Sequence, residues 1–580
     1  MLLPQPTLSD TAMEVLRERY LRRDEAGNLL ETPGRMFERV AAAIALPARA
    51  FGEDAAYWEA RFYERLNRLE FLPNSPTLMN AGLPKGQLAA CFVLPIADDL
   101  ESIFAALNHM ARIHQTGGGT GFSFSRLRPR DDRVGSTGGI TSGPLSFMEL
   151  FDHTTAVIRQ GGRRRGANMA VLRIDHPDIE EFVGAKRQPG RLENFNLSVA
   201  VTDAFWDALA NGKSFALVNP RTGKAVRSVD ARALFDAIVA AAWATGDPGL
   251  LFLDEINRAN PTPALGAIES TNPCGEQPLL AYESCTLGSI NLAVFAAAHD
   301  LDWPRLADAV YDAVVFLDNV IEANHYPFAE IDAASRRTRK MGLGVMGLAD
   351  LLARIGIPYD SEQALTLAGE IAKFVSEKAR AASVDLGAHR GSFPAFHQSV
   401  WPARGFTALR NAALTCVAPT GTISLIAGAS SAIEPFFALA LARRMLDGRR
   451  FVEVNALLER ELAALGEAGR LLECVKKTGS VRCIADFPDD LRRRFPIALE
   501  IAPAFHLRMQ AAFQGHMDAA VAKTVNLPQG APLAAVREVF MLAHELRLKG
   551  VTVYRYGSRA KQVLSLIGEE TLADCRECAV

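Results

Sequence analysis

Five consecutive residues, Asn272-Pro273-Cys274-Gly275-Glu276, place an amide, a thiol and a carboxylate at alternate positions. In an extended backbone, side chains two residues apart point to the same face, so all three could act on one small molecule. The carboxylate is suited to general-base catalysis and the thiol to redox chemistry. The alternative is an ordinary loop in which Gly275 ends a turn and Cys274 is buried, and these residues alone leave both interpretations open.

The chain has eight cysteines in 580 residues and carries no secretion signal that would favour a framework of structural disulfides. We therefore expect any covalent work by the cysteines to be redox or catalytic. Cys91 and Cys285 lie far apart in the sequence, whereas Cys575 and Cys578 form a C-x-x-C pair near its end. Half of a zinc site is the alternative for that pair, but no second C-x-x-C or histidine pair lies nearby, and we expect no metal held by side chains.

Four loops rich in glycine and threonine could hold phosphate groups, because several backbone N–H groups in such a loop can surround one anion. Each alone could be a plain turn, but four in one chain, with arginines nearby, favour phosphate binding; they are residues 117–121, 135–139, 160–166 and 419–424. The sequence has neither the P-loop nor the dinucleotide-binding glycine pattern. We therefore interpret the apolar-acidic run 250–255 as an ordinary buried strand end.

Hydrophobic patterning indicates the elements that must position these residues. Residues 1–72 have apolar side chains at helical spacing, which predicts a small helical N-terminal domain. From 73 to 560, short apolar runs alternate with helical patterns, which favours a mostly parallel α/β sheet with crossover helices. The predicted strands include 91–94, 170–174, 197–201 and 214–218, and the predicted helices include 234–244, 303–324 and 362–386. Residues 451–502 are predicted to be a helical excursion and 561–580 a flexible, redox-active tail.

The composition excludes several classes of function. The net charge of −3, without a long basic tract, argues against a nucleic-acid-binding surface. The sequence shows no targeting signal and no run of about 20 apolar residues that could span a bilayer. We therefore expect a cytoplasmic protein without membrane partners.

Further segments accompany the Asn-Cys-Glu segment, each combining small, polar or thiol side chains: 75–82, 90–91, 284–292, 419–424, 434–435, 551–559 and 575–578. In this order they resemble the catalytic chain of ribonucleotide reductases, over nearly the whole chain from about Asp10. The combination of Cys274 with Cys91 and Cys285 makes the resemblance specific. It implies a ten-stranded α/β barrel of two parallel half-barrels, with a central finger loop that presents Cys274.

The resemblance also implies the reaction, which is reduction of ribonucleotides, most typically diphosphates, to 2′-deoxyribonucleotides for DNA synthesis. Cys274 would become a transient thiyl radical and remove the 3′-hydrogen, Glu276 would accept the 3′-hydroxyl proton, and Asn272 would hold a ribose hydroxyl. Cys91 and Cys285 would supply two electrons and end as a disulfide. That role requires their Cα atoms to lie within about 7 Å of each other in the fold.

Binding partners follow from the same resemblance. The substrate would contact Ser75, Ala90, Gly119, Pro419, Thr420, Gly421, Thr422 and Ile423. Cys575 and Cys578 would re-reduce the internal disulfide and pass the oxidising equivalents to thioredoxin or a similar donor. A dNTP effector that sets specificity would bind at Asp98, Arg128, Gln160 and Arg164, although these arginines could equally form a solvated face. That site lies at a dimer contact in the family, so we expect a homodimer.

The radical source distinguishes three kinds of this family. The oxygen-dependent kind passes the radical through two adjacent tyrosines, but the matching stretch here reads Tyr554-Arg555-Tyr556, and Arg555 interrupts the relay. The anaerobic kind needs a glycyl-radical motif that the surroundings of Gly557 do not match. We therefore expect the cofactor to be adenosylcobalamin, as in the class II enzymes. No D-x-H-x-x-G motif is present, which agrees with reductases that bind cobalamin without a histidine ligand.

Two other interpretations remain open from the sequence. The first is the large catalytic subunit of an oxygen-dependent (class I) reductase with an altered tyrosine relay. The second, from a different class, is an inactive nucleotide-binding regulator on the same fold. The complete set of Asn272, Cys274, Glu276, Cys91 and Cys285 argues against a regulator, because a binding module needs no thiols.

Overall fold

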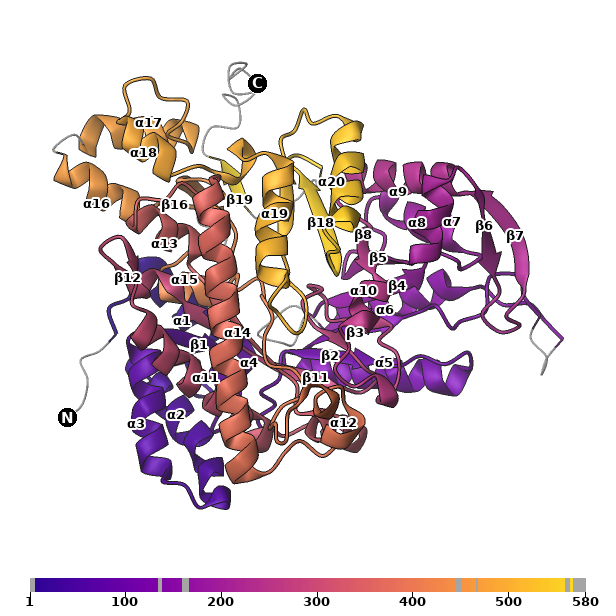
Figure 1. The fold of residues 1–580 in the computed structure, drawn as a ribbon, viewed down its shortest axis with the longest axis horizontal. Helices are drawn as coiled ribbons and strands as arrows, with labels where there is room; N and C mark the ends of the chain where they lie inside the picture. The colour runs from indigo at the N-terminus through magenta and orange to yellow at the C-terminus, as the bar shows by residue number, and fades with distance from the viewer. Residues whose placement is uncertain are drawn as a thin grey trace.

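The computed structural model describes residues 6–133, 138–158, 166–444, 450–465, 468–558 and 564–566. The chain begins with three helices, α1 (Asp10–Arg19), α2 (Pro33–Ala45) and α3 (Ala55–Asn67). Each starts at a residue whose side-chain oxygen accepts a backbone N–H, namely Ser9, Thr32 and Asp54. Their apolar faces share one hydrophobic core with α11 (Trp303–Ala323). Figure 1 shows α11 beside α2 and α3 at the indigo end of the chain. The predicted domain boundary at residue 72 stays a prediction.

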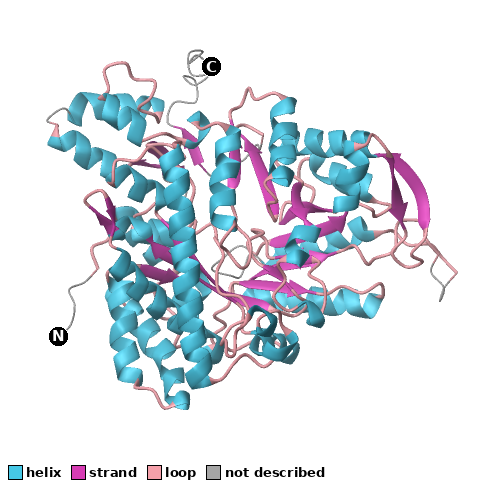
Figure 2. Ribbon diagram, viewed as in Figure 1, coloured by secondary structure: helices cyan, strands magenta, loops and turns pink. Residues whose placement is uncertain are grey.

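A first set of parallel strands forms half of the central barrel. In order these are β2 (Cys91–Leu94), β3 (Gly119–Ser123), β4 (Asn168–Arg173), β5 (Phe195–Val201) and β8 (Gly249–Phe252). The connecting helices are α5 (Leu100–Gln115), α6 (Pro144–Ile158), α7 (Ile179–Gly184), α8 (Asp203–Ala210) and α9 (Ala231–Thr245). Figure 2 shows these strands in the interior with helices on the outside, as expected for parallel strands joined by helical crossovers.

The second half of the barrel is built from β11 (Ser284–Asn291), β14 (Met341–Met346), β17 (Thr524–Leu527) and β18 (Gly550–Arg555). β11 runs parallel to β14 and β17 runs parallel to β18, whereas β11 pairs antiparallel with β2 and β18 pairs antiparallel with β8. Residues 413–417 fill the remaining gap, because parallel bridges join Leu343 to Thr415 and Val417 to Val521. The described chain thus contains a ten-stranded sheet that includes the short β1 (Phe71–Pro73), and the bridges lead from β14 through residues 413–417 to Val521, shortly before β17. The predicted α/β barrel of two half-barrels is confirmed.

The second half-barrel has its own covering helices. These are α12 (Ala329–Thr338), α13 (Leu348–Arg354), α14 (Glu362–Arg390), α19 (Pro503–Gln514) and α20 (Leu533–Glu545). The predicted helices 303–324 and 362–386 correspond to α11 and α14. The predicted strand at 214–218 is correct as a strand but not as a barrel member. As β6 (Ser214–Val218) it pairs only with β7 (Ala225–Asp230) in the described structure, in a hairpin whose many polar residues suit an exposed ribbon.

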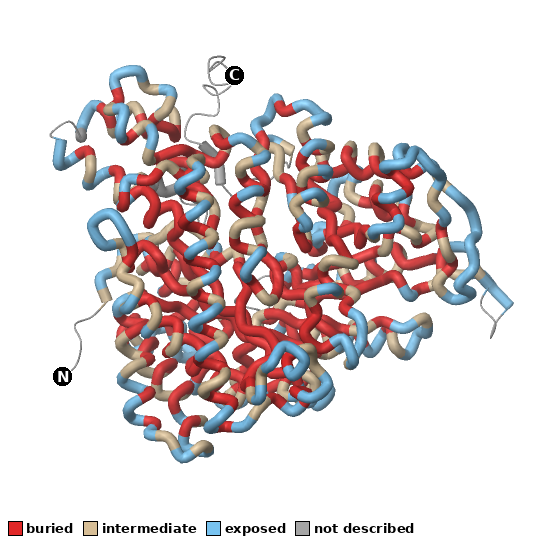
Figure 3. Tube along the Cα trace, viewed as in Figure 1, coloured by how far each residue is buried: buried red, intermediate tan, exposed pale blue. Residues whose placement is uncertain are grey.

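Residues 450–502 form the corner opposite that hairpin. They include β16 (Arg450–Val454), α16 (Ala456–Ala464), α17 (Ala468–Thr478) and α18 (Asp489–Arg494), which lie together at the upper left of Figure 1. β16 pairs with β15 (Ala440–Arg444), which also pairs with β19 (Leu564–Leu566). Figure 3 shows exposed, half-buried and buried residues mixed in this corner, whereas the barrel interior is buried. None of the helices in the described ranges is long and apolar enough to span a membrane.

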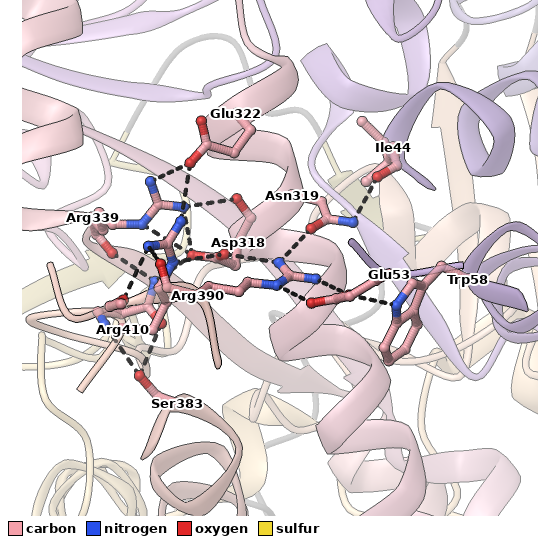
Figure 4. A network of polar contacts seen from close by, with 12 residues as sticks. Ile44, Glu53, Trp58, Asp318, Asn319, Glu322, Arg339, Ser383, Arg390 and Arg410 are labelled. Carbon is pink, nitrogen blue, oxygen red and sulfur yellow. Dashed lines mark hydrogen bonds and ion pairs between the residues drawn. The ribbon is translucent and has the colours of Figure 1, made fainter. Parts of the chain in front are cut away.

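A buried network of charges holds the second half-barrel together. Asp318 on α11 is fully buried and accepts hydrogen bonds from Arg339, Arg390 and Arg410 (Figure 4). Burial alone would raise the pKa of Asp318, but the three guanidinium groups outweigh it and lower the pKa to about 2. Arg339 lies two residues before β14 and Arg410 lies shortly before residues 413–417, so the network ties both segments to α11.

Candidate active site

The Asn-Cys-Glu segment is the tip of a hairpin inside the barrel. β9 (Ser270–Thr271) pairs with β10 (Pro278–Leu279), and the hairpin contacts β2, β3 and β4. The approach is so close that a Cβ atom at Gly121 on β3 would lie 1.7 Å from the carbonyl oxygen of Thr271. Only glycine at this position allows the hairpin to reach the barrel centre.

The tip of the hairpin is a turn, so the extended backbone expected there is wrong. Gly275 has φ +83°, a left-handed conformation that favours glycine, and its N–H donates to the carbonyl of Asn272. The Asn272 side chain accepts the N–H of Gln277 at 2.9 Å, and Asn196 of β5 donates to the carbonyl of Pro273 at 2.8 Å. The turn is therefore fixed both internally and to the barrel wall.

Asn272, Cys274 and Glu276 nevertheless line one cavity of about 280 Å³, together with Cys91. We call this space the Cys91 cavity. Cys274 is exposed to it, whereas Asn272 and Glu276 are each only 2% exposed. The Asn272 amide nitrogen lies 3.2 Å from the Cys91 sulfur, so the amide of the hairpin contacts the barrel thiol directly.

Every residue predicted to contact the substrate lies on the wall of the Cys91 cavity: Ser75, Ala90, Gly119, Pro419, Thr420, Gly421, Thr422 and Ile423. Residues 419–422 lead into the short helix α15 (Ile423–Ala427). Thr420 has a positive φ of 53°, unusual for a β-branched residue, and its hydroxyl accepts the N–H of Ala432 at 2.7 Å. Such strain is concentrated at functional sites, because the surrounding contacts must maintain it.

Cys91 and Cys285 are direct neighbours across the seam between the two half-barrels. They are Cα partners in the antiparallel pairing of β2 with β11, which places such atoms about 4.5–5.5 Å apart. Both are free thiols, and both belong to one small apolar cluster with Cys416. Burial, followed by the nearby Glu276, raises the pKa of Cys91 well above its ordinary value, and burial beside Cys416 does the same for Cys285. Both thiols therefore remain protonated at neutral pH.

A second cavity reaches Cys274 and has a volume of about 380 Å³. We call it the Lys523 cavity, since residues 521–524 line it together with 249–251 and 550–554. Pro273, Cys274 and Pro419 belong to the walls of both cavities. The thiol of Cys274 thus stands between two separate spaces, each large enough for part of a ligand.

The predicted effector residues are only partly described. Arg128 donates to the Asp98 carboxylate at 2.7 Å, so the two form a partly exposed ion pair, and neither residue lines the Cys91 cavity. Gln160 and Arg164 lie outside the described residues, and so do the tail thiols Cys575 and Cys578. Their roles stay predictions.

Arg555, which interrupts the tyrosine pair, has a well-defined place in the structure. Its guanidinium donates to the carbonyls of Trp243 and Gln529 and lies 4.0 Å from the centre of the Trp243 ring. Tyr554, next to it, lines the Lys523 cavity. Because a guanidinium bound in this way is no redox carrier, the structure offers no tyrosine pair at this position.

Several wall residues are not among the site residues predicted from the sequence. Asn74 and Ser289 line the Cys91 cavity, and Lys523 lines the other. Asn74 caps the helix α4 (Ser75–Asn80), and the pattern Asn-Ser-Pro-Thr is a sequence signal for such a cap. Lys523 could have been found as a lone charge between Ala522 and the apolar strand β17.

Comparisons with known proteins agree with this architecture. Residues 7–86 match the model of the ribonucleotide reductase all-alpha domain, and residues 89–408 and 406–554 match the ribonucleotide reductase barrel domain. The vitamin B12-dependent ribonucleoside-diphosphate reductase of Mycobacterium tuberculosis is 53% identical, over 97% of this chain and 80% of its own length. The enzyme of the same name from Thermoplasma acidophilum is 46% identical, over 97% of this chain and 81% of its own.

A solved structure shows the same fold at lower sequence identity. The class Id ribonucleotide reductase alpha subunit of Actinobacillus ureae superposes with a TM-score of 0.77 at 24% identity, covering 95% of this chain and 97% of that one. The family models together cover most of the chain, and two relatives exceed 45% identity over nearly its full length. The chain therefore belongs to the ribonucleotide reductase family.

Proposed function

We propose that this chain reduces ribonucleoside diphosphates to 2′-deoxyribonucleoside diphosphates, the precursors for DNA synthesis, with adenosylcobalamin as its cofactor. The observation that carries the proposal is the meeting of Cys274, Glu276, Asn272 and Cys91 around one cavity, with Cys285 as the cross-strand partner of Cys91. The names of the relatives that share about half of the sequence support the cofactor and the diphosphate substrate.

The reaction removes the 2′-hydroxyl, which is a poor leaving group until a radical forms on the neighbouring carbon. Cys274, as a thiyl radical, takes the 3′-hydrogen, and Glu276 accepts the 3′-hydroxyl proton, a step typically worth roughly 10²–10⁴-fold. The 2′-hydroxyl leaves as water with a proton from the thiol pair. Cys91 and Cys285 supply two electrons and two protons in total and become a disulfide, and Cys274 returns the hydrogen to the 3′-carbon.

The protonation state of the pair fits this task. Because burial keeps Cys91 and Cys285 protonated, each carries the hydrogen that the reaction needs. Asn272, which touches Cys91 and is pinned through Gln277, is well placed to hold a ribose hydroxyl beside that thiol. The loop 419–423 and the chain around Gly119 supply a wall of backbone groups and small side chains suited to a phosphorylated ligand.

The Lys523 cavity fits a second ligand that must reach Cys274 without displacing the substrate. Its wall combines the backbone and mostly apolar side chains of residues 249–251 and 550–553 with the polar groups Glu434, Lys523 and Asn526, which would hold the adenosyl side of the cofactor. Adenosylcobalamin, when bound, supplies the one-electron oxidation of the Cys274 thiol. The chain's own contribution is to present that thiol from a fixed turn at the boundary between the two cavities.

The remaining partners are proposed on the family's general pattern. Cys575 and Cys578 would reduce the Cys91–Cys285 disulfide by exchange and be reduced in turn by thioredoxin or a similar donor. A dNTP would bind near Asp98 and Arg128, with Gln160 and Arg164, at the contact of a homodimer. The cytoplasmic location expected from the sequence also stays a prediction.

The test is reduction of CDP by the purified chain with dithiothreitol, with and without adenosylcobalamin, across a set of effector dNTPs. We expect turnover that requires the cofactor and disappears in Cys274→Ser. In Glu276→Gln we expect kcat to fall by roughly 10²–10⁴-fold while CDP binding persists. Absence of cofactor-dependent turnover on any nucleoside diphosphate or triphosphate would overturn the proposal.

A further inference from the structure

Glu434 is a carboxylate at the meeting point of two cavities. It lines the Lys523 cavity, which contains Cys274, and also a neighbouring cavity of about 420 Å³ bordered by Arg354 and Arg460. Its side chain is 22% exposed, so part of the carboxylate faces these spaces. Glu434 follows the loop 419–424 in the sequence, and the sequence alone predicts no role for it.

A buried network fixes this carboxylate in place. One carboxylate oxygen, Oε2, accepts from the Lys523 ammonium at 2.5 Å, and the other, Oε1, accepts the backbone N–H of Thr524 at 2.8 Å. Lys523 is completely buried and also donates to Nδ1 of His506 at 3.0 Å. His506 in turn points its other ring nitrogen at the carbonyl of Ala498, 3.1 Å away.

The network defines which ligand Glu434 can bind. Burial and the Lys523 charge lower the pKa of His506 well below its ordinary value, so the ring stays neutral and accepts from the ammonium. The group as a whole is then one ammonium and one carboxylate, with no net charge to attract a cation. A carboxylate oxygen has more than one acceptor position, and each Glu434 oxygen already receives one donor from the protein. The acceptor positions of Glu434 that remain favour neutral donors such as hydroxyl groups.

We propose that Glu434 binds the two ribose hydroxyls of the adenosyl group of the cofactor, with Lys523, Thr524 and His506 as its positioning residues. A carboxylate at a fixed angle matches a pair of adjacent hydroxyls, the way an acidic residue recognises ribose in dinucleotide-binding folds. Cys274 lines the same cavity, so a ribose bound to Glu434 would share the Lys523 cavity with the Cys274 thiol. This inference rests on the proposed function.

The experiment measures cofactor binding in the dark, without substrate, by equilibrium titration of the full chain and absorbance of the bound cobalamin. Three ligands separate the contributions: adenosylcobalamin, 2′-deoxyadenosylcobalamin, and methylcobalamin, which lacks the adenosyl group. The variants are Glu434→Gln, which keeps the shape of the side chain but loses its charge, and Glu434→Asp, which keeps the charge but moves the carboxylate away from the cavity by one methylene group. Glu461→Gln is the matched control, because Glu461 pairs with Arg494 and does not line the Lys523 cavity.

We expect Glu434→Gln to weaken adenosylcobalamin binding by roughly tenfold or more, the effect of losing charge-assisted hydrogen bonds. Methylcobalamin should bind Glu434→Gln and wild type equally, which also shows that the variant is folded. The wild type and Glu461→Gln should bind 2′-deoxyadenosylcobalamin more weakly than adenosylcobalamin. Glu434→Gln should bind these two ligands with nearly the same affinity. The affinity of Glu434→Asp for adenosylcobalamin should lie between those of the wild type and Glu434→Gln.

Two results would overturn the inference alone: equal adenosylcobalamin affinity in wild type and Glu434→Gln, or an equal loss for adenosylcobalamin and methylcobalamin. The second of these would assign Glu434 a purely structural role. Failure of the wild type to bind adenosylcobalamin at all would instead overturn the proposed function, and the inference with it.

Discussion

Cys91 on β2 and Cys285 on β11 face each other as Cα partners across an antiparallel seam, although 194 positions separate them in the numbering of the chain. The seam is where the two half-barrels meet, so the thiol pair exists only when both halves are assembled. Cys416, from the second half-barrel, shares their apolar cluster. This arrangement leads to a specific expectation for the oxidised enzyme.

Turnover to exhaustion without external reductant should leave a disulfide between Cys91 and Cys285, because the two strands hold these residues at bonding separation and the tail thiols can reduce it only once. Peptide mass spectrometry after one exposure to CDP and cofactor should find this cross-link in the wild type. Cys285→Ser should form neither the cross-link nor deoxycytidine diphosphate. The control Cys483→Ser, an exposed cysteine outside the cluster, should behave like the wild type. A cross-link between Cys285 and Cys416 in its place would contradict this prediction.

Gly121→Ala should disable the site without touching a reacting group. A Cβ atom at Gly121 would meet the Thr271 carbonyl at 1.7 Å, so the hairpin that carries Cys274 must move. A displacement of about 1 Å can cost on the order of 100-fold in rate, and kcat for CDP reduction is the measurement. Gly184→Ala is the control, since a Cβ there meets nothing within 4 Å. Wild-type turnover in Gly121→Ala would show that the hairpin is not held as described.

Asp318→Asn should destabilise the fold strongly. The change removes the charge that faces Arg339, Arg390 and Arg410 in a fully buried position, and breaking a buried ion pair costs about 3–5 kcal/mol. The free energy of unfolding in urea is the measurement. Glu362→Gln, which breaks an exposed pair with Arg508, should change it little. Equal stability of both variants would argue against a structural role for the Asp318 network.

Lys549 should make stability depend on pH in alkaline solution. Its ammonium is buried against the carbonyls of Met517, Asp518 and Ala519, and burial lowers its pKa from 10.5 to about 8. Between these two values the unfolded chain binds the proton more tightly than the folded chain, so raising the pH through this window favours folding.

This shift in the pKa of Lys549 corresponds to a gain of roughly 3 kcal/mol in the free energy of unfolding across the window. Wild type should therefore gain stability relative to Lys549→Met as the pH rises from 8 towards 10.5, measured by urea unfolding at each pH. A constant difference in the free energy of unfolding between the two proteins over that range would mean that folding does not change the pKa of Lys549.

Tyr556→Phe should retain most of the cofactor-dependent turnover. Arg555, bound to Trp243 and Gln529, separates Tyr556 from Tyr554, so no tyrosine pair is available to carry a radical. An oxygen-dependent reductase that used this tyrosine would lose its activity completely. Turnover numbers with adenosylcobalamin as the sole radical source distinguish the two cases.

The sequence by itself determined the chemistry-bearing residues and the class of fold. Asn272, Cys274 and Glu276 are recognisable because their types and spacing are local, and the motifs around them carried the resemblance to the family. Alternation of apolar runs and helical patterns predicted a mostly parallel α/β sheet, since strand and helix periodicities are also local properties, whereas the barrel was implied by the resemblance. The strand 214–218 was misplaced, because periodicity identifies a strand but not its partner.

The tertiary structure alone decided how these residues meet. The apposition of Cys91 with Cys285 depends on pairing between strands distant in sequence, which no local pattern encodes. The turn at Gly275 replaced the extended backbone expected there, because the hairpin must reverse within the barrel. Glu434, Lys523 and His506 come from three separate segments, and only packing brings a buried ammonium between a carboxylate and a neutral ring. Long-range packing energies, which depend on the whole fold, therefore decided the site's geometry.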